Sequence, residues 1–451
     1  GSTVTPGTIT ANGDPTATTN SPFDDPEGFK FGENEDQNII KTGSYIGNGS
    51  ATGPEINLGW EPSFIIMKNA EKYENWLMWD SMRGIVTDGN DARLFPNLTT
   101  AESSPGDFID LTSTGFKIND NGGDLNEPND KIVYMAIRRP DGYVGKPASA
   151  GTDAFTMAGG NSTGTTWISG FPVGFALYKR YAYVDDWIAS ARQIQGKYLA
   201  PSNATAENSH TSFNFDKNNG WGDLSLNSTW LSYMWKRNAG FDVVAYEGNG
   251  VGGGRQIPHS LNKAPEMIWV KNRDSTTDWN VYHKGLDGGT NPEQKYLVLN
   301  TDAAEADNVN RWNDTAPTST IFTIGDSGRV NTNAHSYIAM LFASANDADD
   351  NPISKVGSYS GANSNQTITL GFQPRFIIIK STSSSRNWVV LDTVRGWSSG
   401  SNDSELNLNK SDAAGSSYDF GGPTATGFTI NYIGNDDTNA SGHTYIYYAH
   451  A

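Results

Sequence analysis

The sequence predicts an all-β protein made of four tandem β-sandwich domains of jelly-roll type. Three observations predict this fold: a composition suited to short strands and turns, a strand motif that occurs four times, and a spacing of one domain between the copies. Aromatic residues make up 11% of the 451 residues and charged residues only 18%, while 49 residues are glycine. Short alternating apolar segments separated by Gly, Asn, Asp and Ser turns are typical of sandwiches and jelly rolls.

The first motif is an apolar strand that starts after a proline and ends in a lysine. It reads LGWEPSFIIMKN at 58–69, SGFPVGFALYKR at 169–180, LNKAPEMIWVKN at 261–272 and LGFQPRFIIIKS at 370–381. Proline can open a strand but not occupy its middle, because it has no N–H for the ladder. The four lysines lie 111, 92 and 109 residues apart. Each copy therefore has the size of a domain and is too long for a solenoid repeat.

A tryptophan follows each of these lysines after eight residues. The four are Trp76, Trp187, Trp279 and Trp388. A tryptophan at the same place in every copy is explained most simply as a core residue, because its burial contributes about 1.5–3 kcal/mol or more. We therefore expect all four indoles to be buried. Two further strands recur, as TGFKI, TSFNF, TIFTI and TGFTI and as VYMAI, TWLSYMW, SYIAMLF and TYIYYA.

Composition and motif positions divide the chain into an arm and four repeats. We expect an N-terminal arm at 1–40, repeat 1 at 41–147, repeat 2 at 148–240, repeat 3 at 241–347 and repeat 4 at 348–451. Repeat 2 is the most divergent copy. A middle unit diverges when one of its faces is adapted to a neighbour. We therefore expect repeats 2 and 3 to make the largest contacts, and repeats 1 and 4 to expose their loops.

Charge, cysteine content and hydropathy argue against several classes of function. The 32 basic and 50 acidic residues give a net charge of −18, which repels nucleic acid and acidic membranes. The chain has no cysteine, so disulfides and thiolate metal sites are excluded. No apolar run approaches the ~18 residues of a membrane span, and the first twenty residues lack a signal-peptide pattern. Gly1-Ser2 is an expression scar or a processed terminus.

The four motifs together resemble a repeat of tail-fibre and other virion proteins of marine bacteriophages. Repeat 1 carries SYIGNGSATG from Ser44 and repeat 4 carries SYSGANSNQT from Ser358, and both have the ending D-x-x-R-G, which repeats 2 and 3 lack. The resemblance spans roughly 41–451. It implies a structural protein on the virion surface, outside the cell, acting in host attachment or particle decoration. Other virion proteins are the implied partners, a homotrimer is expected by analogy, and no catalytic residue is implied.

Tryptophans outside the repeat pattern are candidates for glycan binding. Trp221, Trp312 and Trp397 lie in Gly-, Asn- and Ser-rich segments, where loops often carry function. A glycan-binding module of a bacterial surface or secreted protein is therefore a second hypothesis, with host-surface glycan as its ligand. A polysaccharide-degrading enzyme is a third, because carboxylates ~5–9 Å apart can come from distant strands. No pattern marks such a pair, and we predict that the protein is not an enzyme.

Acidic turns offer candidate ligands for Ca²⁺, the one cofactor considered. The carboxylates concerned are Asp120, Asp124, Asp130, Asp436 and Asp437. Ca²⁺ takes about six to eight oxygen ligands, and the residue order of an EF-hand is absent. Solvated turns are therefore the simpler interpretation of these residues.

A charged set recurs in the two repeats that keep the full motif. Lys68, Asp80 and Arg83 of repeat 1 correspond to Lys380, Asp392 and Arg395 of repeat 4. The corresponding place holds no Asp in repeat 2 and His283 in repeat 3. A catalytic set would be complete wherever it acts, so we predict one structural ion cluster in each full repeat.

Overall fold

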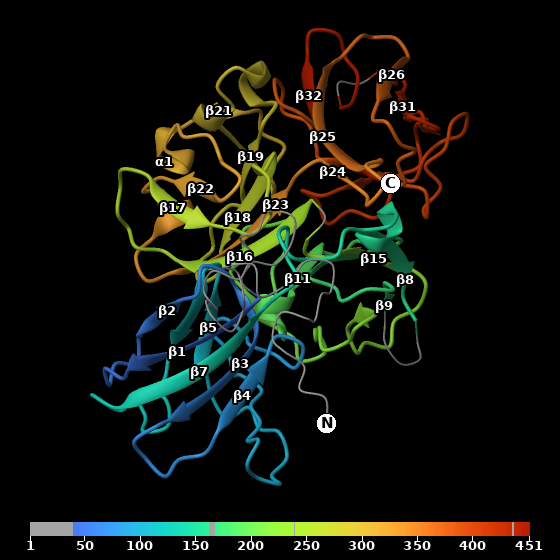
Figure 1. The fold of residues 1–451 in the computed structure, drawn as a ribbon. Coiled ribbons are helices and arrows are strands. Elements are labelled where there is room, and N and C mark those ends of the chain that lie inside the picture. The colour runs from blue at the N-terminus through green and yellow to red at the C-terminus, as the bar shows by residue number, and fades with distance from the viewer. Residues whose placement is uncertain (1–38, 162–166, 239, 435–436) are drawn as a thin grey trace, which may run out of the picture.

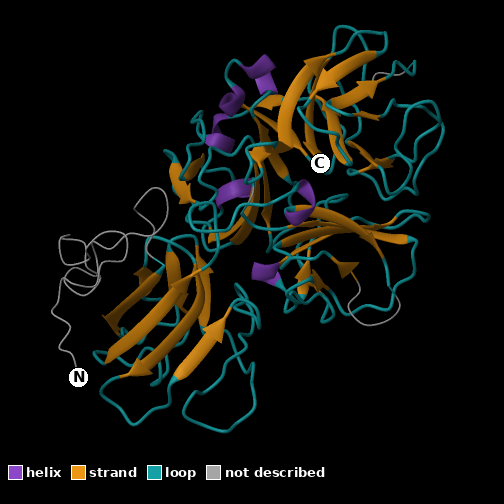
Figure 2. Cartoon of the chain, turned by 45° about the vertical axis from the view of Figure 1, so that its right-hand side comes forward, coloured by secondary structure: helices purple, strands orange, loops and turns teal. Residues whose placement is uncertain are grey.

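The computed structural model describes residues 39–161, 167–238, 240–434 and 437–451, and it shows them as antiparallel sheets joined by turns and loops (Figures 1 and 2). The two α-helices in these ranges, α1 (Val309–Trp312) and α2 (Gly328–Asn331), are single turns. The predicted all-β class, with tandem β-sandwich domains, is therefore confirmed. In the same ranges no helix has the length and hydropathy needed to cross a membrane.

Repeat 1 consists of two sheets. The larger has the strand order β1-β7-β3-β4 and the smaller β2-β6-β5. The strands are β1 (Ile40–Ile46), β2 (Glu55–Asn57), β3 (Pro62–Asn69), β4 (Leu77–Asp80), β5 (Ile109–Thr112), β6 (Gly115–Ile118) and β7 (Lys131–Arg138). Pro62 opens β3, as its missing N–H requires. Side chains alternate between the two faces of β3, so Ile65 and Met67 point to the core between the sheets.

Repeat 2 repeats this order in its main sheet, β8-β15-β10-β11. Its strands are β8 (Phe155–Gly159), β9 (Trp167–Ile168), β10 (Phe175–Arg180), β11 (Ile188–Ala191), β12 (Lys197–Tyr198), β13 (Asn208–Ser209), β14 (Gly220–Trp221) and β15 (Trp230–Trp235). The remaining strands form the pairs β9-β14 and β12-β13. Short 3₁₀ turns lie at η1 (Gly151–Asp153) and η2 (Arg192–Ile194).

Repeat 3 extends the main sheet to β16-β23-β18-β19-β20-β21 and pairs β17 with β22. Its strands are β16 (Phe241–Glu247), β17 (Arg255–Pro258), β18 (Met267–Asn272), β19 (Asn280–His283), β20 (Lys295–Val298), β21 (Ala306–Asp307), β22 (Ile321–Ile324) and β23 (Ser336–Phe342). The 3₁₀ turns η3 (Leu286–Gly289) and η4 (Pro292–Gln294) lie between β19 and β20.

Repeat 4 has the main sheet β24-β25-β32-β27-β28-β29 and the second sheet β26-β31-β30. Its strands are β24 (Ala345–Asn346), β25 (Pro352–Ser360), β26 (Gln366–Thr369), β27 (Phe376–Ser381), β28 (Val389–Asp392), β29 (Leu406–Asn407), β30 (Pro423–Thr424), β31 (Gly427–Ile430) and β32 (Thr444–His450). Each sheet of the chain thus draws its strands from one predicted repeat. The exception is β24, which lies at the end of predicted repeat 3 but pairs with β25 of repeat 4.

Two kinds of hydrophobic core hold these repeats. Each repeat has its own core between its main sheet and its shorter strands. Repeats 2, 3 and 4 also share a larger core, built from the outer faces of their three main sheets. Repeat 1 contributes no residue to that shared core, and Figure 1 shows it, in blue to teal, beside the cluster of the other three. Repeat 4 therefore packs into the centre together with repeats 2 and 3. The relative size of the contacts and the exposure of the loops of repeats 1 and 4 stay predictions.

Candidate functional site

The shared core brings the repeated tryptophans of three repeats together. Trp187, Trp279 and Trp388 are at most 1% exposed and belong to this core. Each indole N–H donates to a backbone carbonyl of a neighbouring repeat: Trp187 to Asn407 at 3.0 Å, Trp279 to Ala200 at 3.0 Å and Trp388 to Val298 at 3.1 Å. Buried indole N–H groups usually find a hydrogen-bond partner, and here that partner belongs to another repeat. The core prediction is confirmed for these three residues, and the bonds show that they join repeats.

The three acceptor carbonyls occupy equivalent places. Leu199, Leu297 and Leu406 each pair with the residue two positions after the tryptophan of their own repeat. The acceptors Ala200, Val298 and Asn407 are the next residues in each case. The indole of repeat 2 therefore donates to a carbonyl of repeat 4, the indole of repeat 4 to a carbonyl of repeat 3, and the indole of repeat 3 to a carbonyl of repeat 2. The three bonds form a closed cycle.

The repeated lysines form a second cycle with the same direction. Each lysine ammonium donates to a carbonyl four residues beyond the tryptophan acceptor: Lys179 to Ser411 at 2.8 Å, Lys271 to Ala204 at 3.3 Å and Lys380 to Asp302 at 3.2 Å. All three lysines are buried. Burial disfavours the charged ammonium and lowers the pKa of Lys179 and Lys271 to about 8 and that of Lys380 to about 7.

Backbone amides form a third cycle between the same pairs of repeats. The N–H groups of Glu207, Glu305 and Ala414, each seven residues beyond the tryptophan acceptor, donate to the carbonyls of Arg273, Thr382 and Tyr181 at 2.8, 2.8 and 2.7 Å. Each carbonyl lies two residues after the repeated lysine. Three head-to-tail contacts of one kind close on themselves, as in a cyclic trimer. Repeats 2, 3 and 4 therefore form a pseudo-threefold ring within one chain.

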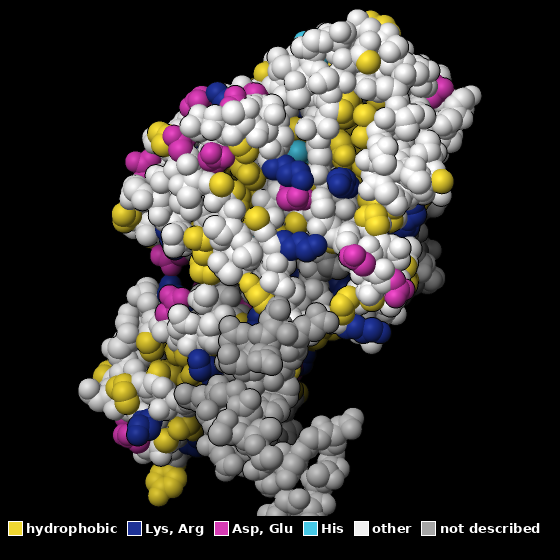
Figure 3. Space-filling model, turned by 45° about the horizontal axis from the view of Figure 1, so that its top comes forward, with side chains coloured by type: hydrophobic (Ala, Val, Ile, Leu, Met, Phe, Trp, Pro, Cys, Tyr) yellow, Lys and Arg dark blue, Asp and Glu magenta, His cyan; other side chains and the backbone are white. Residues whose placement is uncertain are grey.

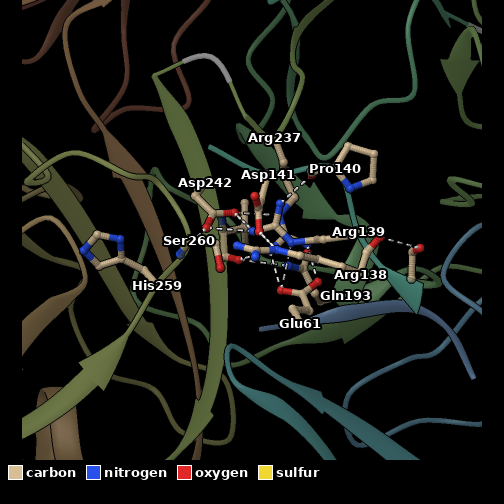
Figure 4. A network of polar contacts seen from close by, with 12 residues as sticks. Glu61, Arg138, Arg139, Pro140, Asp141, Gln193, Arg237, Asp242, His259 and Ser260 are labelled. Carbon is tan, nitrogen blue, oxygen red and sulfur yellow. Dashed lines mark hydrogen bonds and ion pairs between the residues drawn. The ribbon is translucent and has the colours of Figure 1, made fainter. Parts of the chain in front are cut away.

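A cluster of four alternating charges attaches repeat 1 to this ring (Figure 4). Arg237 binds Glu61 with both terminal nitrogens at 2.7 Å, and Arg139 binds both oxygens of Asp242 at 2.7 and 2.8 Å. Arg237 also contacts Asp242 at 2.9 Å, and Arg139 contacts Glu61 at 3.2 Å. Burial opposes ionisation of Asp242, but the two guanidinium groups bring its pKa down to about 2. The cluster joins repeats 1, 2 and 3.

The predicted ion cluster of the full repeats is only partly correct. Asp80 accepts from Arg83 at 2.6 Å, and Asp392 accepts from Arg395 at 2.6 Å. The lysine is not part of this pair, because it binds main-chain carbonyls instead. In repeat 4 the pair is buried, and Tyr233 of repeat 2 donates its hydroxyl to Asp392 at 2.8 Å. The Asp–Arg pair of repeat 4 thus also contributes to the ring.

The tryptophans predicted to bind glycan lie inside the repeats. Trp221, Trp312 and Trp397 are at most 3% exposed. Trp221 stacks on Trp167 with centroids 4.7 Å apart, and its indole donates to Ser232 at 3.0 Å. A sugar ring cannot reach these faces, so the assignment of these three residues to glycan binding was wrong. Gly-, Asn- and Ser-rich flanking sequence does not fix the direction of a side chain, and Trp221 and Trp312 lie in β14 and α1 and not in loops.

Trp76 of repeat 1 is the opposite case. Its side chain is 41% exposed, so the expectation that it is buried in the core was wrong. The repeat's own core takes Leu77 and Trp79 from the same strand region. Trp76 lies on the other face, the one that the ring covers in repeats 2, 3 and 4.

The acidic turns are occupied by protein contacts in the described ranges. Asp120 accepts from the backbone N–H of Gly122, and Asp130 accepts from Asn69 and pairs with Lys72. Burial, together with the neighbouring Glu74, raises the pKa of Asp124. Asp437 has an interaction partner, and Asp436 lies outside the described residues. No group of three His, Cys, Asp or Glu side chains placed to hold a metal occurs in the described part of the chain.

A cavity of about 340 Å³ lies between repeats 1 and 3. In its lining, Lys117 of repeat 1 pairs with Glu247 of repeat 3 at 2.9 Å, and Asp110 accepts from the backbone N–H of Asp88 at 2.9 Å. Burial, with nearby Asp107 and Asp88, raises the pKa of Asp110 to about 6. The cavity is thus part of the contact between the two repeats.

The fold and its contacts define an all-β protein in which three β-sandwich repeats close into a ring and a fourth stands beside it. The chain belongs to the family described as Domain of unknown function (DUF7483), whose model matches residues 29–139 and 221–451. The unmatched segment covers most of repeat 2, the copy that sequence comparison within the chain marks as divergent. No curated protein matches the chain.

Proposed function

We propose that this protein is a bacteriophage virion structural protein, a tail or head-surface fibre that decorates the particle or attaches it to the host surface. The observation that carries this proposal is the use of the repeated polar residues. The lysine and tryptophan of each of three repeats bind carbonyls of a neighbouring repeat. Residues that recur in order to join domains support an architectural role.

Rigidity supports the same proposal. A tandem array joined by loops alone would bend between its domains. Here the shared core and three cycles of hydrogen bonds fix repeats 2, 3 and 4 together, and buried ion pairs fix repeat 1 to them. A spacer or decoration on a particle surface needs such a rigid body.

Surface charges of both signs are interspersed in Figure 3, so that face carries no continuous patch of one sign.

Immunogold electron microscopy of purified virions tests the proposal. Antibody raised against the folded chain should label particles of the phage that encodes it, at the tail or on the head. Peptides of the chain should also be found by mass spectrometry of the same particles after density-gradient purification. Unlabelled particles, in a preparation where the antibody binds the free protein, would contradict the proposal.

A further inference from the structure

Repeat 1 has the local geometry that builds the ring in the other repeats. The backbone N–H of Trp76 donates to the side chain of Asn97 at 3.0 Å, 21 residues later. The same bond joins Trp279 to Asn300 and Trp388 to Asn409, each at 2.9 Å and with the same separation. This match aligns repeat 1 with repeats 3 and 4 residue by residue. It makes Phe95 the equivalent of the tryptophan acceptors Val298 and Asn407.

The repeat 1 lysine makes only part of its expected set of bonds. Lys271 donates to the carbonyls of Asn272 and Ser275 in its own repeat and to Ala204 of repeat 2. Lys68 donates to the two equivalent carbonyls of its own repeat, those of Asn69 and Lys72. The third acceptor, which a neighbouring repeat supplies elsewhere, has no counterpart among the described contacts of Lys68.

The outer face of the main sheet in repeat 1 is apolar and partly exposed. We call it the repeat 1 face, and it comprises Phe64, Ile66, Trp76, Met78, Val133, Met135 and Ile137. The strand registers align it with core residues of the ring. Phe64 and Ile66 correspond to Phe376 and Ile378 of repeat 4, which are at most 2% exposed. A contiguous apolar face rimmed by polar groups marks an interaction site.

We propose that the repeat 1 face binds the repeat 1 faces of two further copies of this chain, so that the protein is a homotrimer. The three copies would form the same ring that repeats 2, 3 and 4 form within one chain. Trp76 would donate to the Phe95 carbonyl of the next copy, Lys68 to its Thr99 carbonyl, and the amide of Glu102 to the Ala70 carbonyl of the copy before it. Each of these groups holds the place of one that makes this bond in the internal ring.

The internal ring also fixes the number of copies. A head-to-tail contact generates either a closed ring or an open filament, depending on the rotation between neighbours. In this chain the same contact closes after three repeats. The internal ring itself has no vacancy for a fourth repeat, because each of its three lysines and tryptophans already has its partner. Identical copies are therefore the occupants that the geometry of repeat 1 fits.

The mass of the full chain in solution tests the proposal. Native mass spectrometry and sedimentation at micromolar concentration should give three chain masses. Trp76→Glu should reduce the mass to one chain mass without changing the circular dichroism spectrum, because the side chain is exposed within the chain. The matched control is Tyr432→Glu, since Tyr432 is an aromatic residue of repeat 4 with the same exposed fraction of 41%; this variant should stay trimeric.

Three outcomes would overturn the trimer. A monomeric wild type would show that another segment, such as residues 1–38, or a different partner covers the repeat 1 face. A dimer would contradict threefold closure, and a trimeric Trp76→Glu variant would place the interface elsewhere. The inference does not depend on the proposed function, since a monomeric chain can still be found on virions and a trimer can be absent from them.

Disulfide trapping tests the geometry itself, because the chain has no cysteine of its own. In the internal ring the equivalent residues are joined by one backbone hydrogen bond of 2.7–2.8 Å. Main chains joined in this way lie about 5 Å apart, a spacing at which a disulfide can form. The double variant Ala70→Cys with Glu102→Cys should therefore give a covalent trimer on oxidation, resolved by reducing and non-reducing electrophoresis. Either single variant should give no covalent trimer. A ladder of longer oligomers, or monomer alone from the double variant, would contradict the proposed ring.

Discussion

Repeats 1 and 4 carry the same motif, yet their outer sheet faces differ. Strand β27 of repeat 4 is buried at all six positions, whereas β3 of repeat 1 alternates between buried and partly exposed positions. Trp388 is 1% exposed and Trp76 is 41% exposed. The Asp–Arg distance is 2.6 Å in both repeats. The Asp–Arg pair is therefore alike in the two repeats, and the neighbours decide which residues of the outer face are buried.

The largest expected effect comes from removing a ring tryptophan. Trp388→Ala leaves a cavity and should lower the free energy of unfolding by about 3–5 kcal/mol, with about 1 kcal/mol more for the lost hydrogen bond to Val298. Trp76→Ala, measured at a concentration where the chain is monomeric, should change it by no more than about 0.5 kcal/mol. Urea unfolding of both variants checks the pair. Equal losses would remove the difference between the two repeats.

Substitutions at the junction between repeat 1 and the ring should lower the free energy of unfolding by nearly as much. Glu61→Ala leaves Arg237 buried with one carboxylate partner fewer and should cost about 3–5 kcal/mol. The double variant Glu61→Ala with Arg237→Ala should lose less than the sum of the two single losses, because neither charge is then left unpaired. Denaturant unfolding of the wild type, the two single variants and the double variant gives the coupling free energy between Glu61 and Arg237. Additive losses would mean that the pair does not hold the junction.

A smaller effect is expected where repeat 2 contacts repeat 4. Tyr233→Phe removes the hydroxyl that donates to Asp392 at 2.8 Å in a buried site. Hydrogen bonds to charged groups contribute about 1.5–3 kcal/mol, and the melting temperature should fall accordingly. Met135 of repeat 1 is aligned with Tyr233, so Met135→Leu is the matched control and should leave it nearly unchanged. No change in Tyr233→Phe would indicate that Arg395 alone satisfies the carboxylate.

The smallest effect, counted per pH unit, is the dependence of stability on pH. Burial, with a smaller contribution from nearby Arg375, lowers the pKa of His450 to about 3. Between about pH 6.5 and 3 the unfolded chain binds a proton at this residue that the folded chain does not bind. The free energy of unfolding therefore decreases as the pH is lowered through that window, by at most about 1.4 kcal/mol per pH unit.

Repeat 1 has Ile137 at the position of His450, so His450→Ile removes this titration. The slope of unfolding free energy against pH should become shallower between pH 6.5 and 3 and stay the same between pH 7 and 8. Urea unfolding at several pH values measures both slopes. An unchanged acid slope would show that the histidine does not contribute to it.

Much of the fold could be predicted from the sequence, because the patterns that produce strands and turns are local. Proline before an apolar alternation marks a strand start, and four copies of that pattern set the number of domains. The burial of the individual tryptophans could not be predicted in this way. Trp221 and Trp397 follow glycine-rich or polar sequence, and only the position of the second sheet turns their indoles inward. Trp76 and Trp388 share one motif, so no local rule separates the exposed indole from the buried one.

The sequence by itself determined the all-β class, the four repeats and the residues that recur in them, because periodicity and turn chemistry act over a few residues. Only the tertiary structure decided that three repeats close into a ring and that the fourth keeps the same face uncovered. The sequence around a lysine that ends a strand is the same in both cases: where a carbonyl of another repeat is its third acceptor, and where its described contacts include no such acceptor. The difference depends on chain segments about 70 to 230 residues away, and contacts at that range leave no periodic trace in the sequence.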